Sequence, residues 1–488
     1  MLRGCGACVA AFAVDFYKGA DAQLARRAME QDFDVLTSAL LEGHSGLYRY
    51  STRCNTNELW HDVRARIKSD MSLVDFYRLL SVVIAHVKCG HTYLLLPEDA
   101  RERVVNELRV LPLFVRIVGS RVFAFQSDEG ATGLSGAEIV AVNQVPAGQL
   151  LRRLVSFTPG DGSIVTSREW RITRGYTFAK GYHLFPIALY LELGIHSPFT
   201  LEYRLPPHGV ASRVVLQGTT PSELLATGLE APGVGSSGPP SACLHFIDDG
   251  RIAVLRIRSF SDSTPAEDGQ ELGPYLISAF RQLHARNTQT LIVDLRDNGG
   301  GRDELGKRLV ALLLDRPFEY YEELTVNALT FTFSHYCDRQ IEIPRSAVEP
   351  GRYGSYRLTD HPNWGLQHPL PERFGGRVYV LINGGSFSTT CEALSILHYN
   401  KRATFIGEES GGGYYGNSSH FMPRVTLPNS GIILHLPLVT YHMAVSGYPF
   451  NDRGLIPDHQ VTYSIQELLA GEDKELHLAL GLARGGHT

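Results

Sequence analysis

The stretch that most constrains the fold is residues 384–397, GGSFSTTCEALSIL. It follows an apolar run at residues 377–383, RVYVLIN, which is typical of a buried strand. It then places Ala393, Leu394 and Leu397 at helical spacing, so a strand-to-helix turn is predicted here. Glycines permit the tight backbone of such a turn, and free N–H groups at the helix start can bind an oxyanion. A Ser hydroxyl on this turn suits a nucleophile, although Ser and Thr residues there would also serve to cap a helix.

Neighbouring segments extend this pattern into alternating strands and helices. Strand-like runs occur at residues 251–260, RIAVLRIRSF, and at residues 290–301, TLIVDLRDNGGG. The second of these runs ends in glycines. Helix-like runs lie at residues 271–287 and 306–314. This order predicts a sheet with parallel strands and right-handed crossovers. Because sites form at the carboxyl ends of parallel strands, both glycine-rich turns lie where a site is expected.

The N-terminal half has a different character. Residues 22–100 carry apolar residues at helical spacing, whereas residues 108–126 indicate two strands around a Gly-Ser turn. A stretch rich in Gly, Pro and Ser at residues 229–241 is typical of a linker. We therefore expect the following division of the chain: an N-terminal tail (1–21), a helical domain (22–105), a β-rich domain (106–228), the linker (229–241), an α/β core (242–470) and a C-terminal tail (471–488).

Composition argues against several classes of function. The chain has 488 residues, of which 43% are hydrophobic and 20% charged, as in ordinary globular proteins. Its 46 basic and 51 acidic residues include no basic cluster, so no nucleic-acid partner is expected. Since no apolar run reaches the roughly 18 residues that span a bilayer, the chain is not expected to be an integral membrane protein.

The cysteines and the N-terminal segment give weaker indications. Seven scattered cysteines fit neither a disulfide framework nor a zinc site, and no metal or organic cofactor is predicted. Cys5 and Cys8 have CxxC spacing within a short apolar segment near the N-terminus. That segment has features of a remnant signal peptide, but its apolar part is too short to establish one.

Six motifs then occur in a fixed order along the chain. They are GHT (90–92), GAEIVAVNQVPAGQLLRRL (136–154), DLRDNGGG (294–301), GGSFST (384–389), GEESGGG (407–413) and RGLIPD (453–458). In this order, and over most of its length, the chain resembles the C-terminal processing peptidases, also called tail-specific proteases. Each motif alone is a weak or moderate signal, and the resemblance depends on all six together.

The resemblance implies a fold and a reaction. The fold would be a multi-domain α/β protein with an N-terminal helical domain, a PDZ-like β-rich domain and a crotonase/ClpP-like α/β protease core. The reaction would be serine-type peptide hydrolysis, an endopeptidase activity on protein or peptide substrates that needs no cofactor. A PDZ-like domain would bind a peptide end by strand addition. The alternative, that this domain only packs beside the core, stays open.

The same resemblance assigns the nucleophile and the base. The family's nucleophile is the second Ser of an S-x-S pair, here Ser388, with Ser386 as the less favoured alternative. A Ser hydroxyl needs a base, and the best-known branch uses a Lys about 25 residues further on. This chain has no Lys between Lys401 and Lys474, so a Ser–Lys dyad at that place is untenable.

The tricorn-type branch of the family offers a different base, a His from an N-terminal segment. His91 matches that position, and a neutral imidazole can take the Ser proton and return it to the leaving amine. A buried structural role for His91 is the competing interpretation. His398, on the helix that follows the nucleophile segment, is the alternative base by proximity.

The remaining site residues are assigned less uniquely. The tricorn-type branch orients its His with a Glu near the closing motif, where strict register gives Asn451 in this chain. We therefore favour the neighbouring Asp452, then Glu409, then Glu408, and a Ser–His pair with a weak third member stays open. The oxyanion donors implied by the resemblance are the backbone N–H groups of the following residues: Gly299 or Gly300, and Thr389. A nucleotide-binding loop is disfavoured, because neither G-x-G-x-x-G nor GK[ST] occurs there.

Two other functions stay open at this point. The leading alternative is a catalytically inactive peptide- or ligand-binding protein on the same fold, which the missing Lys favours. An esterase that uses the same Ser–His pair is the third. Because the family is typically exported in bacteria, the resemblance implies a periplasmic or extracellular location, with the cytoplasm as the alternative. The oligomeric state, the substrate and the cleavage preference stay open.

Overall fold

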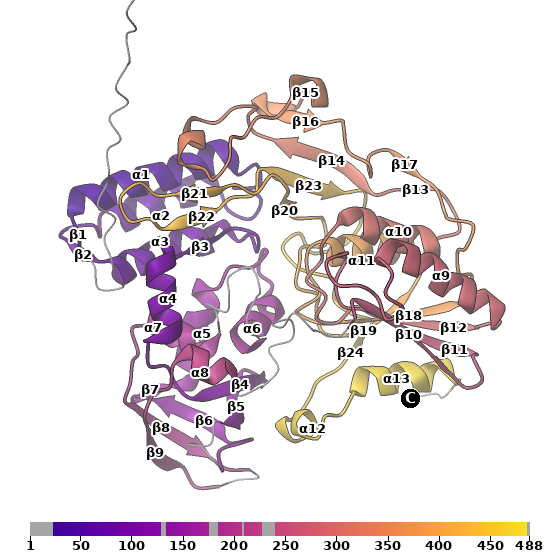
Figure 1. The fold of residues 1–488 in the computed structure, drawn as a ribbon, viewed down its shortest axis with the longest axis horizontal. Coiled ribbons are helices and arrows are strands. Elements are labelled where there is room, and N and C mark those ends of the chain that lie inside the picture. The colour runs from indigo at the N-terminus through magenta and orange to yellow at the C-terminus, as the bar shows by residue number, and fades with distance from the viewer. Residues whose placement is uncertain (1–22, 128–132, 175–183, 207–208, 227–239, 486–488) are drawn as a thin grey trace, which may run out of the picture.

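The computed structural model describes residues 23–127, 133–174, 184–206, 209–226 and 240–485. Within these residues the chain forms a mixed α/β fold built from several sheets (Figure 1). The predicted N-terminal tail at residues 1–21 and most of the predicted linker at residues 229–241 lie outside the described residues. None of the helices described is both long enough and apolar enough to cross a membrane.

The N-terminal part of the chain is helical, as predicted. Its helices are α1 (Arg26–Gly43), α2 (Arg53–Arg64), α3 (Leu73–Val87) and α4 (Glu98–Asn106), with a short pair of strands, β1 (Gln23–Leu24) and β2 (Met71–Ser72). The Ser72 side chain caps α3 by accepting from the Asp75 N–H at 3.1 Å. That helix ends at Lys88, which adopts the left-handed conformation with φ 54°. The chain therefore turns sharply at residue 88 and enters β3 (Tyr93–Leu95) a few residues later.

Strand β3 is held by a segment from the far end of the chain. It pairs antiparallel with β22 (Ile433–His435), which in turn pairs with β21 (Arg424–Thr426). Figure 1 shows this late hairpin lying among the N-terminal helices. Since β3 directly follows residues 88–92, the pairing fixes the position of the predicted GHT motif relative to the C-terminal half.

A second core lies in the β-rich part. Its sheet has the strand order β4-β5-β6-β8-β9, and β7 pairs with β6. These strands are β4 (Leu113–Val118), β5 (Arg121–Ser127), β6 (Glu138–Val142), β7 (Val145–Pro146), β8 (Phe199–Arg204) and β9 (Ser212–Leu216). The predicted Gly-Ser turn joins β4 to β5, and Gly119 and Ser120 both have positive φ there.

Helices cover the β-rich sheet and connect it to the rest of the molecule. They are α5 (Ala147–Phe157), α6 (Val165–Arg174), α7 (Phe185–Leu191) and α8 (Pro221–Ala226). Helix α5 buries Leu150, Leu151 and Leu154 against the sheet, so one face of this amphipathic helix contributes to the core.

The predicted parallel sheet forms the centre of the C-terminal half. Its order is β10-β11-β12-β18-β19-β24, and every neighbouring pair from β11 to β24 is parallel, whereas β10 is antiparallel to β11. The strands are β10 (Ala242–Ile247), β11 (Ile252–Ile257), β12 (Thr290–Asp294), β18 (Arg377–Ile382), β19 (Thr404–Gly407) and β24 (His459–Gln460). The three glycine-containing turns that follow β12, β18 and β19 consequently meet at one edge, because parallel strands share the direction of their carboxyl ends.

Both faces of this sheet are buried, and alternate residues face opposite layers. Ala253 and Leu255 belong to the core shared with α9 (Leu272–Ala285), α10 (Asp303–Leu313) and α11 (Thr389–Tyr399). Ile252 and Val254 belong to the core shared with the C-terminal helix α13 (Lys474–Ala483). Burial on both faces explains why these strands read as continuous apolar runs in the sequence.

The remaining elements form a peripheral layer that the sequence did not predict. A five-stranded sheet has the order β15-β16-β14-β23-β20 and lies beside α1 and α10 (Figure 1). The elements of this part are β13 (Phe318–Glu319), β14 (Tyr321–Val326), η3 (Thr332–Tyr336), η4 (Arg345–Ala347), β15 (Val348–Pro350), η5 (Arg352–Gly354), β16 (Tyr356–Leu358), β17 (Leu366–Gln367), β20 (Ser418–Ser419) and β23 (Val439–Met443). Helix α12 (Ile465–Leu469) lies apart from this layer and precedes α13 in the chain (Figure 1).

A buried guanidinium connects the DLRDNGGG segment to the C-terminal helix. Arg296, whose side chain is 13% exposed, contacts Asp294 at 2.9 Å, Asp473 at 2.7 Å and Glu475 at 3.2 Å. Asp473 also caps α13 by accepting from the Leu476 N–H. Charge-assisted contacts of this kind are strong when desolvated, and removal of one partner leaves the others buried and unpaired.

We predict that Arg296→Gln lowers the free energy of unfolding by about 3 kcal/mol, because three carboxylates lose their cation in a buried place. Chemical denaturation followed by circular dichroism measures this change. Arg484→Gln is the matched control, since Arg484 is half exposed in its pair with Asp248 and its replacement should cost much less. Equal losses in the two variants would contradict the assignment.

Candidate active site

Ser388 lies on the predicted strand-to-helix turn, between β18 and α11. Its backbone has φ 57° and ψ −128°, a strained conformation for a residue with a side chain. Such strain is typical of a Ser that a sharp turn presents above the edge of an α/β sheet. The turn is held from the DNGGG segment, because the Asn298 carbonyl accepts from the Phe387 N–H at 3.0 Å and from the Thr390 hydroxyl at 2.9 Å.

The two serines of the S-x-S pair have different environments. Ser386 is fully buried, and its hydroxyl donates to the Leu295 carbonyl at 2.8 Å and accepts from the Asn383 N–H at 3.1 Å. That hydroxyl is part of the turn itself. Ser388 is partly exposed, so it is the serine of the pair that the turn presents.

The structure brings His91 to Ser388. The His91 Nε2 atom lies 3.0 Å from the Ser388 Oγ atom, although 297 positions separate the two residues in sequence. The imidazole is 5% exposed and packs against the Phe387 ring, with the two centroids 4.6 Å apart. His398, the alternative base, instead contacts the Tyr414 hydroxyl through Nδ1 at 2.8 Å.

Gly90 allows this close approach. A Cβ atom at Gly90 would lie 2.6 Å from the Phe387 ring and 2.9 Å from the Arg171 guanidinium, so a larger residue would displace the segment. Arg171 is a buried residue of α6, and both of its Nη atoms donate to the Gly90 carbonyl at 3.2 Å. The β-rich part therefore helps to hold the histidine segment.

Burial sets the protonation state of the imidazole. It lowers the pKa of His91 from 6.5 to about 4, while the Asp161 charge raises this pKa and the Arg171 charge lowers it. His91 is consequently neutral near pH 7, and its Nε2 atom can accept a proton from Ser388. His44 lies close by with its Nε2 atom 2.9 Å from the Thr92 hydroxyl, and burial also lowers its pKa to about 4.

The structure does not bring the predicted third residues to His91. Glu409 forms a two-point ion pair with Arg453, at 2.6 and 2.7 Å, and accepts from the Gly454 N–H at 3.0 Å. Asp452 contributes its backbone carbonyl to the contact with the Ser163 N–H at 2.8 Å. Within the described residues the His91 Nδ1 atom is buried and has no hydrogen-bond partner, so Asp452, Glu409 and Glu408 make no contact with it.

Another carboxylate reaches this region, and sequence reasoning missed it. Asp161 is 2% exposed and accepts from the Gly90 N–H at 2.7 Å and from the Gly413 N–H at 3.2 Å. The only signal in the sequence is its position between two glycines, Gly160 and Gly162. Gly162 has φ 51°, and a Cβ atom there would lie 2.2 Å from the Asp452 carbonyl oxygen, so this loop packs tightly on the core.

The three predicted oxyanion donors are not equivalent. The Gly300 N–H donates to the Asn298 side chain at 2.9 Å and is therefore occupied. Within the part of the chain that the structure describes, the N–H groups of Gly299 and Thr389 make no hydrogen bond. Gly300 still packs on the site, because a Cβ atom there would lie 2.8 Å from the Ser388 Cβ atom. The free Thr389 N–H lies at the start of α11, where the helix dipole favours negative charge.

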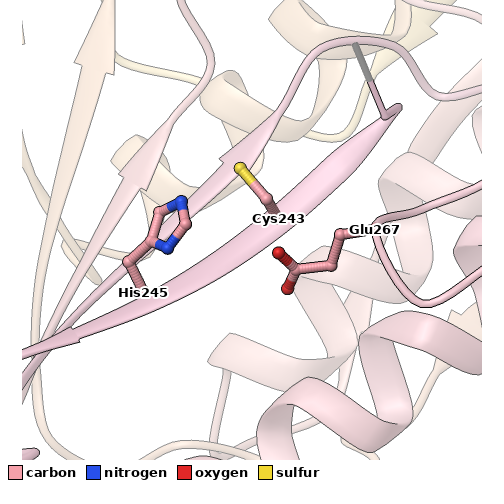
Figure 2. Close-up of side chains that lie close together, drawn as sticks. All are labelled: Cys243, His245 and Glu267. Atoms are coloured by element: carbon pink, nitrogen blue, oxygen red, sulfur yellow. The ribbon is translucent and has the colours of Figure 1, made fainter.

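A separate group of side chains has the chemistry of metal ligands. Cys243 and His245 lie on the same face of β10, and their donor atoms and those of Glu267 are within 4.8 Å of one another (Figure 2). However, the Glu267 Oε1 atom already accepts from the Leu244 N–H at 2.8 Å and from the Tyr275 hydroxyl at 2.6 Å. Two cationic side chains, those of Arg256 and Arg258, act on the Cys243 thiol. Their positive charges would also repel a divalent ion. We assign no metal to this group.

A large cavity lies between the β-rich sheet and the edge of the parallel sheet. Its volume is about 660 Å³. It is bordered by β4 and α6 on one side and by Asp297, Asn383 and Asp473 on the other. Within the described residues β4 is an end strand of its sheet, and its residues 114 and 116–118 line the cavity.

Comparison with known proteins gives a family match for part of the chain and a resemblance in fold. Residues 251–461 match the family described as Peptidase family S41. The whole chain resembles the crystal structure of mature CPAF, with a TM-score of 0.62 and 17% identity over 95% of this chain and 99% of that one. Mature CPAF complexed with lactacystin gives a TM-score of 0.64 and 17% identity, over 94% of this chain and 98% of that one. A search of curated protein sequences finds no match.

The buried histidines predict a pH dependence of stability. In the unfolded chain His44 and His91 take up a proton near pH 6.5, whereas in the folded protein their pKa values are about 4. At these two residues the unfolded state therefore binds more protons between these values, so their contribution to the free energy of unfolding should fall as pH decreases from 6.5 to 4. The slope should approach about 1.4 kcal/mol per pH unit for each histidine.

Urea denaturation at several pH values measures this slope. The variant His91→Gln should show a shallower slope over the same range, whatever its absolute stability, because one titrating group has been removed. The same pH dependence in the wild type and in His91→Gln would show that the His91 imidazole is not held neutral.

Proposed function

Because its residues 251–461 match the family described as Peptidase family S41, we propose that the chain is a serine peptidase of that family, and hence a hydrolase, which cleaves peptide bonds through Ser388 and His91. One observation carries the assignment of these two residues, the 3.0 Å separation between the His91 Nε2 and Ser388 Oγ atoms. The strained backbone of Ser388 gives independent support.

The proposed reaction follows from this pair. As the Ser388 Oγ atom attacks the substrate carbonyl carbon, its proton passes to the His91 Nε2 atom. The imidazolium then gives that proton to the amine that leaves when the peptide bond breaks. Water attacks the resulting ester, His91 again takes and returns a proton, and Ser388 is regenerated. No step of this sequence needs a lysine, in agreement with its absence between Lys401 and Lys474.

Backbone donors are proposed to stabilise the negative charge of the tetrahedral intermediate. The free N–H groups of Gly299 and Thr389 suit this role, while the occupied N–H of Gly300 does not. Preorganised donors of this kind act where charge develops and need no rearrangement during the reaction. Gly300 instead provides the space that lets the DNGGG turn pack against Ser388.

The pairing of a histidine with Ser388 is closer to the tricorn-type branch of the family than to its Ser–Lys branch. It also favours an enzyme over the alternative of an inactive binding protein, because a protein that only binds has no need of a serine and an imidazole within hydrogen-bond distance. We therefore keep the peptidase as the function that the geometry supports best.

Substrate is proposed to approach along the β-rich sheet, which we interpret as the PDZ-like domain. Residues of β4, an end strand of its sheet within the described residues, line the 660 Å³ cavity, and the opposite border contains Asp297 and Asn383, next to the turn that carries Ser388. An extended segment of an unfolded protein can pair with such an edge through its backbone, without a fixed sequence.

The nucleophile assignment predicts that Ser388→Ala lowers hydrolysis of an unfolded protein such as casein by at least about 1,000-fold, because the attacking oxygen is removed. The circular dichroism spectrum should stay that of the wild type. His91→Gln should reduce the rate to a similar degree, whereas His398→Gln, on the helix after the nucleophile, should leave it within about twofold. Loss of activity in His398→Gln together with retained activity in His91→Gln would show that His398, and not His91, is the base.

The oxyanion assignment predicts a loss of kcat in Gly300→Ala. The new Cβ atom would lie 2.8 Å from the Ser388 Cβ atom and 3.0 Å from the Thr389 nitrogen, so it would displace a proposed donor. We expect a decrease of about 100-fold or more, as for removal of one oxyanion donor.

Gly365→Ala is the matched control for this experiment. Gly365 also has positive φ, +74° against +98° for Gly300, but no atom lies within 4 Å of a Cβ atom placed there. Both variants carry similar backbone strain, so only Gly300→Ala should lose activity. Equal activities in the two variants would show that the turn does not take part in catalysis.

A further inference from the structure

In the loop at residues 158–164, which joins α5 to α6, several backbone carbonyl groups accept hydrogen bonds from one buried side chain. Arg168 of α6 is 8% exposed and donates to the carbonyls of Thr158 at 3.1 Å, Gly160 at 2.9 Å and Gly162 at 3.0 Å, and also to that of Ile164. A buried guanidinium with four carbonyl partners holds this loop in one shape. A carboxylate carried by the loop therefore has a fixed position.

This loop and the first turn of α6 contact the histidine segment and the segments that carry Asp452 and Glu409. The Gly162 N–H donates to the Lys88 carbonyl at 3.0 Å, just before the histidine motif. The Ser163 N–H donates to the Asp452 carbonyl at 2.8 Å, and the Thr166 hydroxyl donates to the Glu409 carbonyl at 2.9 Å. The loop thus docks on the backbone of the two residues that the sequence favoured as acid partners of His91.

Asp161 lies at the centre of this junction. Its Oδ1 atom accepts from the N–H of Gly90, the residue before His91, and its Oδ2 atom accepts from the Gly413 N–H in the turn after β19. The carboxylate is 2% exposed, so water does not screen its charge effectively. It connects the histidine segment to the core through two hydrogen bonds.

The charged and titratable groups that face His91 are few. Asp161 acts on it from the loop and Arg171 from α6, while His44 lies on the segment after α1. Of these groups, Asp161 is the one with negative charge. The His91 Nδ1 atom is buried and, within the described residues, has no hydrogen-bond partner, so no acid of the usual kind supports the ring directly.

We propose that Asp161 is a positioning residue for His91, which holds the histidine segment through the Gly90 N–H and supplies the negative charge that favours the imidazolium formed during Ser388 attack. The inference rests on the proposed function. Asp161 neither touches substrate nor takes the proton, which stays on His91 until it passes to the leaving amine. Its role is thus divided between a backbone contact and an electrostatic effect through space.

Asp161→Asn tests this role, since it removes the charge and keeps the size of the side chain. With the carboxylate gone, burial and Arg171 act on His91 unopposed, so its pKa should fall further. The acid limb of the kcat/KM profile should consequently move to lower pH, and kcat near pH 7 should fall about tenfold for each pKa unit lost by the imidazolium. An acid limb that stays in place or moves to higher pH would overturn the proposal.

A matched control separates the effect of the Asp161 charge from the effect of the contacts that hold its loop on the core. Thr166→Val removes the hydrogen bond from the same part of the chain to the Glu409 carbonyl without changing any charge. It should leave the acid limb unmoved and kcat within about twofold of the wild type. If Thr166→Val lowers kcat as much as Asp161→Asn does, the loop acts only by docking and the electrostatic role is wrong.

A double variant tests whether Asp161 acts through the imidazole. In a His91→Gln background, the residual hydrolysis of an activated ester should be unchanged by Asp161→Asn, because there is no imidazolium left to stabilise. A further loss of tenfold or so would overturn the proposal. Should Asp161→Asn not fold, Asp161→Ser, which leaves room for water to accept from the two N–H groups, is expected to show the same shift of the acid limb.

The same measurements distinguish this proposal from the proposed function. A folded wild type that hydrolyses neither protein nor ester would overturn the peptidase assignment and the role of Asp161 together. An active wild type with an Asp161→Asn variant of unchanged kcat and pH profile would overturn the role of Asp161 alone.

Discussion

The contact between His91 and Ser388 depends on the pairing of β3 with β22. One strand lies at the end of the N-terminal helices and the other is contributed by the last quarter of the chain, yet their register is fixed over three residue pairs. That register positions residues 88–92 above the carboxyl edge of the parallel sheet, where the strained Ser388 turn ends. Gly90 completes the arrangement, because any larger residue would meet Phe387 and Arg171. A site shared by two distant segments therefore rests on ordinary strand pairing.

Buried electrostatics then determine what this contact can do. Burial keeps His91 neutral and able to accept a proton, but it also disfavours the imidazolium that the reaction must form. The fold opposes this penalty with a carboxylate from a third segment, at residue 161, which reaches the site through the β-rich part of the molecule. In the proposed mechanism the helical, β-rich and α/β parts thus each contribute to one proton transfer, which gives a physical reason for their close packing.

Much of this arrangement could be predicted from sequence, and the exceptions share one cause. The buried strands before Asp294 and Asn383, and the helices after them, follow from local apolar patterns and glycine-rich turns. Asp161 could not be predicted, because nothing near it in sequence indicates that its carboxylate reaches Gly90 and Gly413. The sequence also could not show that the Gly300 N–H is occupied while the Gly299 N–H is free, because this depends on the orientation of the Asn298 side chain. The short strands between residues 318 and 367 were missed, since they are only two to six residues long and have no clear alternation of their own.

Covalent labelling of Ser388 by a fluorophosphonate tests the central claim most directly, because it reports the nucleophile and its base without any assumption about substrate. Mass spectrometry of the digested protein locates the adduct and follows its rate of formation near pH 7. The account predicts an adduct on Ser388 in the wild type and a rate at least about 1,000-fold lower in folded His91→Gln. A folded wild type without label on Ser388, or a His91→Gln variant that labels at the wild-type rate, would contradict it.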